Sequence, residues 1–380
     1  MTTTSDLPAS QDPRWLVGLL GEYSQLLEHL ASRQRVVVVE ADPLSGATGI
    51  VSAAAGSLEL VVLSVDARPA ANIADLANSI AMKGVAHFAP EAVSWWNSGG
   101  QHTRESFQFA HSVSQSGIDL ESLRLGKARH DQLRRVFELL ETVTNAPLWL
   151  FIDHLDDMLE RLRPADRDEL LGSLRAQSQV STKIHQLLVG RTAGQLSAAL
   201  NDPDHPLFRA GDQMTIRRPN PRRFVDDLAI GRPSYRGPIP LLGAAAELAA
   251  GAPPYVWRIV EAASTAGNNP RESALAAWRR LQNDLEPSIA QQFVLAGAIH
   301  RSGPEVLIAL AKGTGPYELP LNPKTVRDAL NRMRARGMIF SPGPQRWAIS
   351  DPALAAWARA RTSAGAGTTT PRQAETVSGR

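Results

Sequence analysis

The sequence of 380 residues contains no cysteine. Disulfide bonds, zinc–thiolate centres and thiol-based catalysis are therefore excluded. No apolar run approaches the ~20 residues that a membrane-spanning helix needs, so we expect no membrane association. An excess of one charge is also missing, because 40 Lys and Arg residues face 38 Asp and Glu residues. Overall charge thus neither favours nor excludes nucleic acid, and only a local cluster of basic residues could indicate it.

The two ends of the chain lack the features of a targeting signal and of a folded segment. The first residues, MTTTSDLPASQDPRW, have neither the basic start nor the apolar stretch of a signal peptide, which predicts a cytoplasmic protein. Residues 1–12 and 362–380 are rich in small and polar residues. Such segments bury too little surface to offset the entropy of ordering, so we expect both to be disordered.

Between these ends, short apolar runs alternate with amphipathic segments. The runs are nearly unbroken, which is typical of strands buried on both faces of a parallel sheet, and the alternation with helices indicates an α/β domain. We expect strands at 35–41, 60–66, 148–153, 184–190 and 213–216, and helices at 72–82, 127–143, 167–177 and 221–230. Residues 83–126, which include WWNSGG, are less regular and predict an insertion of loops and short helices.

After about residue 233 the predicted strands end. Two helices joined at 251–254 and a third at 270–285 form a helical segment. Further helices are predicted at 289–300, 304–311 and 324–336, followed by two short apolar stretches around PGPQ. This order of three helices and a hairpin is that of a winged helix. Gly337 stands where a left-handed residue is expected to end the third helix.

A lysine is missing from a stretch that otherwise has the layout of a phosphate-binding loop. VVVVEADPLSGATGIV, residues 36–51, reproduces the strand, turn and helix of G-x-x-x-x-G-K-[ST], with Gly46 and Thr48 in place. Ala41 and Ala47 replace the first glycine and the lysine. Such loops bind phosphate through backbone N–H groups and a helix N-terminus. The candidate nucleotide-binding residues are Ser45, Gly46, Ala47 and Thr48; an ordinary strand-to-helix turn is the alternative.

The second motif is APLWLFIDHLDD, residues 146–157, an apolar strand that ends in Asp153. A carboxylate at this position is typical of a Walker B strand, where it holds magnesium. Thr48 and Asp153 are therefore the predicted magnesium contacts, through a bound nucleotide. The next residue is His154, and we expect Asp156 and Asp157 to point elsewhere. A strand-end aspartate that caps the following helix is the alternative.

A third buried strand ends in Gly190 and Arg191. Such a position can sense a γ-phosphate, although an arginine at a strand end is more often a surface residue. Arg209 precedes the last predicted strand, where it could reach the phosphate of a neighbouring subunit or be solvated.

Together and in this order, these pieces resemble the AAA+ class of P-loop ATPases, over roughly residues 15–360. The closest likeness is to the branch that contains archaeal-type ATPases, origin-recognition-type initiators and STAND signalling ATPases. The resemblance implies a P-loop NTPase-like core with a parallel sheet, a helical lid whose Gly251-Ala252-Pro253 turn packs near the nucleotide, and a winged helix. The implied bounds are 13–232, 233–285 and 286–361, with Pro253 as a further nucleotide contact.

The departures from the family pattern concern catalysis. Members that hydrolyse ATP need the loop lysine and usually a glutamate after the Walker B aspartate, and this chain has Ala47 and His154. The resemblance therefore implies a pseudo-ATPase that binds ATP or ADP with Mg weakly or not at all. Two alternatives stay open: an active ATPase whose missing groups come from a partner subunit, and a protein-assembly scaffold that uses neither nucleotide nor DNA.

The helix predicted at 324–336 has an apolar face and a basic face. Val326, Leu330 and Met333 have the spacing of a core face. A basic face that carries an asparagine suits entry into a DNA groove. The candidate DNA contacts are Lys324, Arg327, Asn331 and Arg334, together with Arg346 beside the predicted wing tip. Protein docking, with a partner or with a second copy of the chain, is the alternative.

Overall fold

The computed structural model describes residues 16–32, 34–88, 132–191, 195–229, 235, 237–263, 269–343 and 346–364. The chain divides into two units, Met1–Leu275 and Ala276–Arg380. Residues 1–12, the WWNSGG stretch and most of the predicted insertion lie outside the described residues, as does the tail after residue 364. Residues 83–88 belong to a regular helix, so the irregular insertion predicted from residue 83 is wrong at that end.

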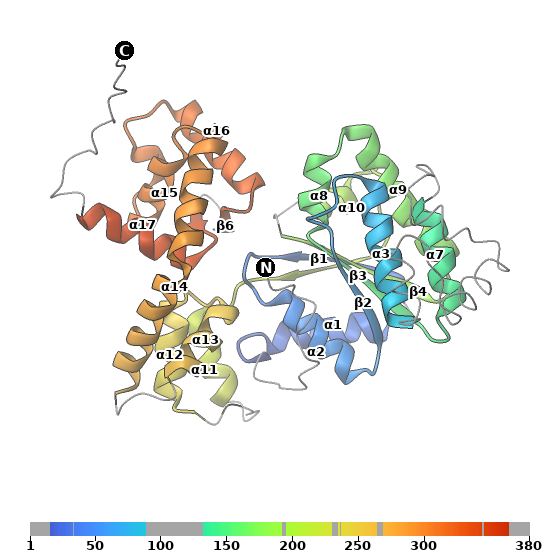
Figure 1. Ribbon diagram of the computed structural model, residues 1–380, viewed down its shortest axis with the longest axis horizontal. Helices are drawn as coiled ribbons and strands as arrows, with labels where there is room; N and C mark the ends of the chain where they lie inside the picture. Colours follow the sequence, from blue (N-terminus) through green and yellow to red (C-terminus); the bar gives the residue numbers. More distant parts are fainter. Residues whose placement is uncertain are drawn as a thin grey trace, which may run out of the picture. The chain divides into compact units, whose positions relative to one another are not determined.

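Five parallel strands form the sheet of the first unit, in the order β2-β3-β4-β1-β5 (Figure 1). All five were expected from the sequence, and their ends differ from the prediction by at most one residue. β1, β3 and nearly all of β4 are buried on both faces, whereas β2 and β5 alternate because they lie at the edges of the sheet. The bounds are Val36–Ala41 for β1, Val61–Asp66 for β2, Leu148–Asp153 for β3, Ile184–Gly190 for β4 and Asp212–Ile216 for β5.

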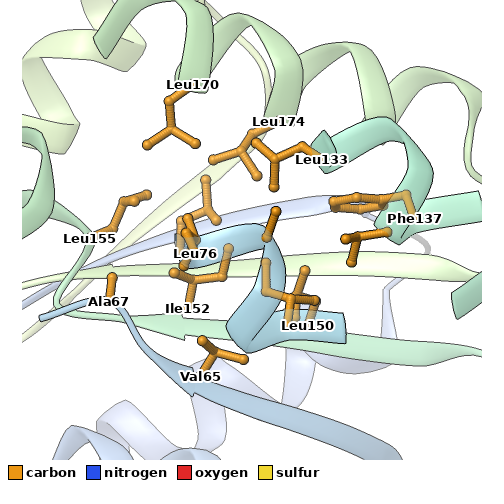
Figure 2. Close-up of a cluster of buried hydrophobic side chains, with 14 of the residues drawn as sticks. Val65, Ala67, Leu76, Leu133, Phe137, Leu150, Ile152, Leu155, Leu170 and Leu174 are labelled. Atoms are coloured by element: carbon orange, nitrogen blue, oxygen red, sulfur yellow. The ribbon is translucent and has the colours of Figure 1, made fainter. Parts of the chain in front are cut away.

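Helices cover both faces of this sheet. Val37 and Val39 of β1 belong to an apolar cluster with helices α1 and α2, whereas Val36 and Val38 belong to a second cluster with five other helices. Figure 2 shows part of the second cluster, where Leu150 and Ile152 of β3 lie among leucines of the covering helices. The first group comprises α1 (Leu20–Ala31) and α2 (Ala47–Ser57); the second comprises α3 (Ile73–Phe88), α7 (Gln132–Val143), α8 (Leu155–Arg161), α9 (Pro164–Val180) and α10 (Gln195–Asn201).

Three further helices complete the first unit before the chain continues into the long helix α14. They are α11 (Pro221–Ala229), α12 (Ile239–Leu248) and α13 (Pro253–Ala263). The turn expected at 251–254 separates α12 from α13, as predicted. Gly251 has φ +72°, and a Cβ atom there would lie 1.9 Å from the carbonyl oxygen of Pro219. Only glycine fits this turn, which leads directly into Pro253.

The helices predicted at 270–285 and 289–300 are one helix, α14 (Pro270–Ile299), which continues through Pro287. The predicted break between residues 285 and 289 is wrong, because α14 continues through Pro287 with the loss of one backbone hydrogen bond. Pro287 and Asn283, whose carbonyl loses its partner, are both exposed, so water can satisfy that carbonyl.

The second unit has the helices and hairpin of a winged helix. After α14 come α15 (Gly303–Lys312), the short η4 (Pro316–Glu318), α16 (Pro323–Ala335), β6 (Ile339–Gly343) and β7 (Arg346–Ile349). The side chain of Asn322 caps the N-terminus of α16, and Gly337 ends it with φ +65°, as expected. Val326, Leu330 and Met333 are fully buried, which confirms the predicted core face.

A last helix, α17 (Pro352–Ala364), was not predicted. Its sequence, PALAAWARARTSA, merges into the small-residue tail and shows little amphipathic pattern. Contacts with other helices of the second unit hold it in place: Trp357 packs against Phe293 with ring centroids 5.2 Å apart, and Arg359 donates to the carbonyl of Ala311. Residues 362–364 are therefore helical, not disordered.

Within the described part of the chain, no helix is both long and apolar enough to cross a membrane. The domain bounds at 13, 232, 285 and 361 stay predictions; α14 runs through residue 285 without interruption.

Candidate functional site

The order of the strands brings three sequence motifs together at one edge of the sheet. In parallel strands all carboxyl ends lie at the same edge. β4 lies between β1 and β3, so Arg191, which follows β4, lies between Asp153 at the end of β3 and Thr48 at the start of α2, the helix that follows β1. Sequence reasoning considered these residues separately, because the strand order was not known.

Arg191 binds both of the predicted magnesium contacts. Its Nε atom donates to Asp153 Oδ1 at 3.0 Å, and its Nη2 atom donates to Asp153 Oδ2 at 2.6 Å. The same Nη2 atom donates to Thr48 Oγ1 at 3.0 Å, and the Thr48 hydroxyl donates to Asp153 Oδ2 at 3.1 Å. The side chains of Arg191 and Asp153 are only 12% and 11% exposed. The three residues thus form one closed hydrogen-bonded group.

The loop after β1 contains two left-handed residues and leads into an uncapped helix. Leu44 and Gly46 are left-handed, with φ +57° and +84°, and α2 starts at Ala47 without a side-chain cap. Successive right- and left-handed residues direct backbone N–H groups into one concavity that suits an anion. The Ser45 hydroxyl is buried, and no residue that the structure describes hydrogen-bonds to it. An uncapped helix start and an orphaned buried hydroxyl both fit a phosphate oxygen.

Contacts with the segment after β5 fix this loop. Asp42 accepts hydrogen bonds from the Arg217 side chain at 3.2 Å and from the Arg218 backbone N–H at 2.9 Å. The guanidinium of Arg218 donates twice to the carbonyl of Pro43, at 2.6 and 3.1 Å. Sequence reasoning missed these residues, because nothing local in RRPNP indicates a partner 175 residues earlier in the chain.

The turn of the helical segment also reaches the loop. A Cβ atom built on Gly46 would lie 3.3 Å from Pro253 Cγ and 3.3 Å from Leu19 Cδ1. Pro253 is therefore packed against Gly46. Ala47, at the lysine position, is fully buried in the apolar cluster with α1 and α2. The position of the motif's lysine is therefore part of the apolar core and carries no ammonium group.

The atoms predicted to hold magnesium do not fit that ion as they are arranged. Magnesium takes six oxygen ligands in an octahedron at about 2.0–2.1 Å. Here both oxygens of Asp153 and the hydroxyl of Thr48 accept N–H groups of one guanidinium. In the described ranges, no cluster of three or more His, Cys, Asp or Glu residues could hold a metal ion.

Two residues that follow Asp153 support this arrangement. His154 is left-handed, its backbone N–H donates to Asp153 Oδ1 at 2.9 Å, and its Nδ1 atom lies 3.1 Å from Asp157 Oδ2. Asp156 is fully buried, and its Oδ2 atom accepts the backbone N–H of Arg191 at 2.8 Å. Sequence analysis expected Asp156 to point elsewhere, whereas its carboxylate lies against the backbone of Arg191.

The surroundings of Asp153 stabilise its negative charge. Burial alone would raise the pKa of this carboxyl, but the positive charge and hydrogen bonds of Arg191, with smaller contributions from His154 and Thr48, lower it below its ordinary value. A second pair lies at the end of β2, where Arg68 chelates Asp66 and the pKa of Asp66 is also lowered. Asp153 is therefore ionised at neutral pH and paired with Arg191.

The predicted DNA contacts lie on α16 and at the start of β7. Lys324, Arg327 and Asn331 are exposed, Arg334 is half-buried and Arg346 is exposed. Arg209, the other candidate phosphate contact, is exposed, and its guanidinium lies 4.9 Å from the centre of the Phe208 ring.

The fold is similar to that of solved structures. A Walker-type ATPase of Pyrococcus abyssi aligns with 89% of this chain and 95% of its own, with a TM-score of 0.58 and 14% identity. The chain shares the fold of a Walker-type ATPase. The expected fold class is thereby confirmed, and Arg191, Asp153 and the loop at 41–48 lie at the carboxyl edge of that fold's sheet.

Other similar structures come from two further archaea. The ORC2 protein of Aeropyrum pernix, in ADPNP–ADP complexes, covers 90% of this chain and 94% of its own, with a TM-score of 0.49 and 15% identity. Cdc6p from Pyrobaculum aerophilum covers 95% and 96%, with a TM-score of 0.42 and 14% identity. No protein-family model matches the sequence, and the search of curated proteins found no match.

Proposed function

We propose that this chain is a nucleotide-binding regulatory protein that does not hydrolyse ATP efficiently and that binds DNA through its winged helix. The observation that carries the first part is the closed group of Thr48, Asp153 and Arg191 beside the loop that follows β1. The loop retains the backbone for binding phosphate. Three features of a hydrolytic site are absent from this proposed site. Ala47 stands in place of the lysine and His154 in place of the glutamate. The two groups that would contact the metal are bound to Arg191.

Ser45 offers a test that separates binding from folding. Its buried hydroxyl has no partner within the described residues, and leaving such a group unpaired costs about 1–3 kcal/mol. We expect Ser45→Ala to raise the free energy of unfolding of the nucleotide-free protein. The same substitution should weaken ADP binding about tenfold, because a hydrogen bond to a charged phosphate is lost.

Urea unfolding and calorimetric titration with ADP measure the two effects. Ser52→Ala, on the exposed side of α2, is the matched control and should change neither, because its hydroxyl donates to the helix carbonyl of Thr48 and is exposed to solvent. Absence of ADP binding by the wild-type protein would remove the nucleotide part of the proposal and favour a nucleotide-independent scaffold.

The DNA part rests on the exposed basic surface of α16. Arg327 and Asn331 are exposed one turn apart, and Lys324 is exposed near the capped start of the helix. Side chains in this arrangement can enter a major groove, where arginine pairs with guanine and asparagine with adenine. Arg346, exposed at the start of β7, is placed to contact a phosphate beside the hairpin.

Replacing Arg327 and Arg334 by alanine should weaken DNA binding and reduce its salt dependence. Each lost phosphate contact lowers the slope of log K against log salt by about one. Fluorescence anisotropy with duplex DNA at several salt concentrations measures both effects. Arg271→Ala, a charge removed from the start of α14, is the control. Unchanged affinity and slope in the double variant would indicate protein docking by this surface.

A further inference from the structure

We propose that the Arg191 guanidinium takes the place of magnesium, so that the site holds nucleotide phosphates without a divalent cation. This inference rests on the proposed nucleotide binding and adds the cation on which that binding depends. It concerns three side chains of the first unit, Thr48, Asp153 and Arg191, whose contacts have been described above.

The guanidinium of Arg191 lies where a magnesium ion would be expected. A magnesium ion in a phosphate loop would contact the hydroxyl at the end of the loop and face the aspartate of the neighbouring strand. In this chain both groups are bound to a single cationic group: Nη2 of Arg191 bridges Thr48 Oγ1 and Asp153 Oδ2, at 3.0 and 2.6 Å. The guanidinium thus makes the two contacts that define the magnesium position.

Contacts of the backbone hold Arg191 beside Asp153 and Thr48. The backbone N–H of Arg191 donates to the buried Asp156 Oδ2 at 2.8 Å. The preceding Gly190 is tightly enclosed, since a Cβ atom there would lie 3.0 Å from Leu196 Cδ1 and 3.4 Å from Asp156 Cγ. Arg191 is therefore anchored at both its main chain and its side chain, and the site is assembled before any ligand arrives.

The guanidinium of Arg191 also has N–H donors that can bind a ligand. Arginine carries five N–H groups. The contacts of Nε and Nη2 with Asp153 and Thr48 use three of them. No residue in the described ranges accepts a hydrogen bond from Nη1, so its two N–H groups can donate to a phosphate oxygen. Guanidinium groups suit this task because their planar donors match phosphate geometry.

Charge explains why the affinity should not depend on added metal. A divalent cation beside one carboxylate leaves a net positive charge, whereas Arg191 beside Asp153 leaves none. Ala47 adds no charge of its own. Phosphates are therefore bound by backbone N–H groups of the loop and by Nη1 of Arg191, and magnesium would have to displace the guanidinium before it could contribute.

The test is calorimetric titration with ADP in EDTA and in magnesium chloride. We expect wild-type dissociation constants that agree within about twofold in the two buffers. In Arg191→Ala, ADP should bind about tenfold or more weakly in EDTA, since a charge-assisted hydrogen bond is lost, and magnesium should restore part of that affinity. A tenfold or larger tightening of wild-type ADP binding by magnesium would overturn the proposal, whatever the variant does.

A titration with manganese distinguishes a failure of this inference from a failure of the proposed nucleotide binding. If ADP binds in neither buffer, the proposed function fails, and the free wild-type protein is titrated with Mn²⁺ by electron paramagnetic resonance. Manganese binding that Asp153→Asn abolishes would show that a metal displaces Arg191, and the inference would fail as well. Absence of Asp153-dependent manganese binding would show that the guanidinium excludes a metal, and only the nucleotide part of the inference would then fail.

Discussion

Asp153→Ala should lower the free energy of unfolding by about 3–5 kcal/mol. Removing one partner of a buried ion pair leaves the other charge uncompensated, and such losses are typically of this size. Both side chains are close to one-tenth exposed, so solvent screens the pair little. Urea unfolding of the wild-type protein and the variant at neutral pH measures the difference. In a site where the aspartate faces only solvent and a metal, the same substitution would have little effect on stability.

Asp157→Ala is the matched control, four residues further along the chain. Its carboxylate pairs with His154, but the two side chains are 26% and 20% exposed. We expect a loss below about 1 kcal/mol, the usual range for accessible pairs. The double variant Asp153→Ala/Arg191→Ala should lose less free energy of unfolding than the sum of the two single variants. The reason is that each substitution removes the same interaction. Equal effects of Asp153→Ala and Asp157→Ala would contradict the closed group.

At acidic pH, Asp153→Ala should no longer lower the free energy of unfolding. The pKa of Asp153 in the folded chain lies below its ordinary value, which is about 3.9 in an unfolded chain. Its contribution to stability is therefore fully present above that value and is lost as the pH falls through the lower, folded pKa. The difference between the wild-type protein and Asp153→Ala should accordingly be constant from pH 7 to about pH 5 and shrink below about pH 4.

The wild-type protein should show no ATP turnover above background. Losing one electrostatic stabiliser of a transition state costs about 10²–10³-fold in rate, and this site lacks both the lysine and a free metal position. Asp153→Ala should give the same background rate. A phosphate-release assay over a range of protein concentrations measures this. A rate that rises faster than the protein concentration would support the alternative of an active site completed by a partner subunit.

The elements that sequence reasoning predicted are those whose signal is local. Val36–Val39 and Leu148–Ile152 are unbroken apolar runs, and such runs can be buried on both faces only in a central strand. Gly337 marks the end of α16 by its own backbone preference, since it is left-handed with φ +65°. The break predicted between residues 285 and 289 was wrong, because α14 continues through the exposed Pro287.

The contacts that define the site are long-range and were not predictable from local pattern. Arg191 stands 143 residues after Thr48 and 38 after Asp153, and their meeting depends on β4 lying between β1 and β3. Asp42 and Arg217 meet only because β5 lies beside β1. The sequence identified the loop and the strand-end aspartate from their motifs, but it could not show that an arginine binds both.

The central claim is that this site keeps the shape of a phosphate loop and has lost its hydrolytic chemistry. One calorimetric titration of the wild-type protein with ATP in magnesium buffer tests both halves together, since binding gives heat that saturates and hydrolysis gives heat that continues after each injection. We predict saturating heat and a baseline that returns to its starting level. A sustained displacement of the baseline that disappears in Asp153→Ala would contradict the account.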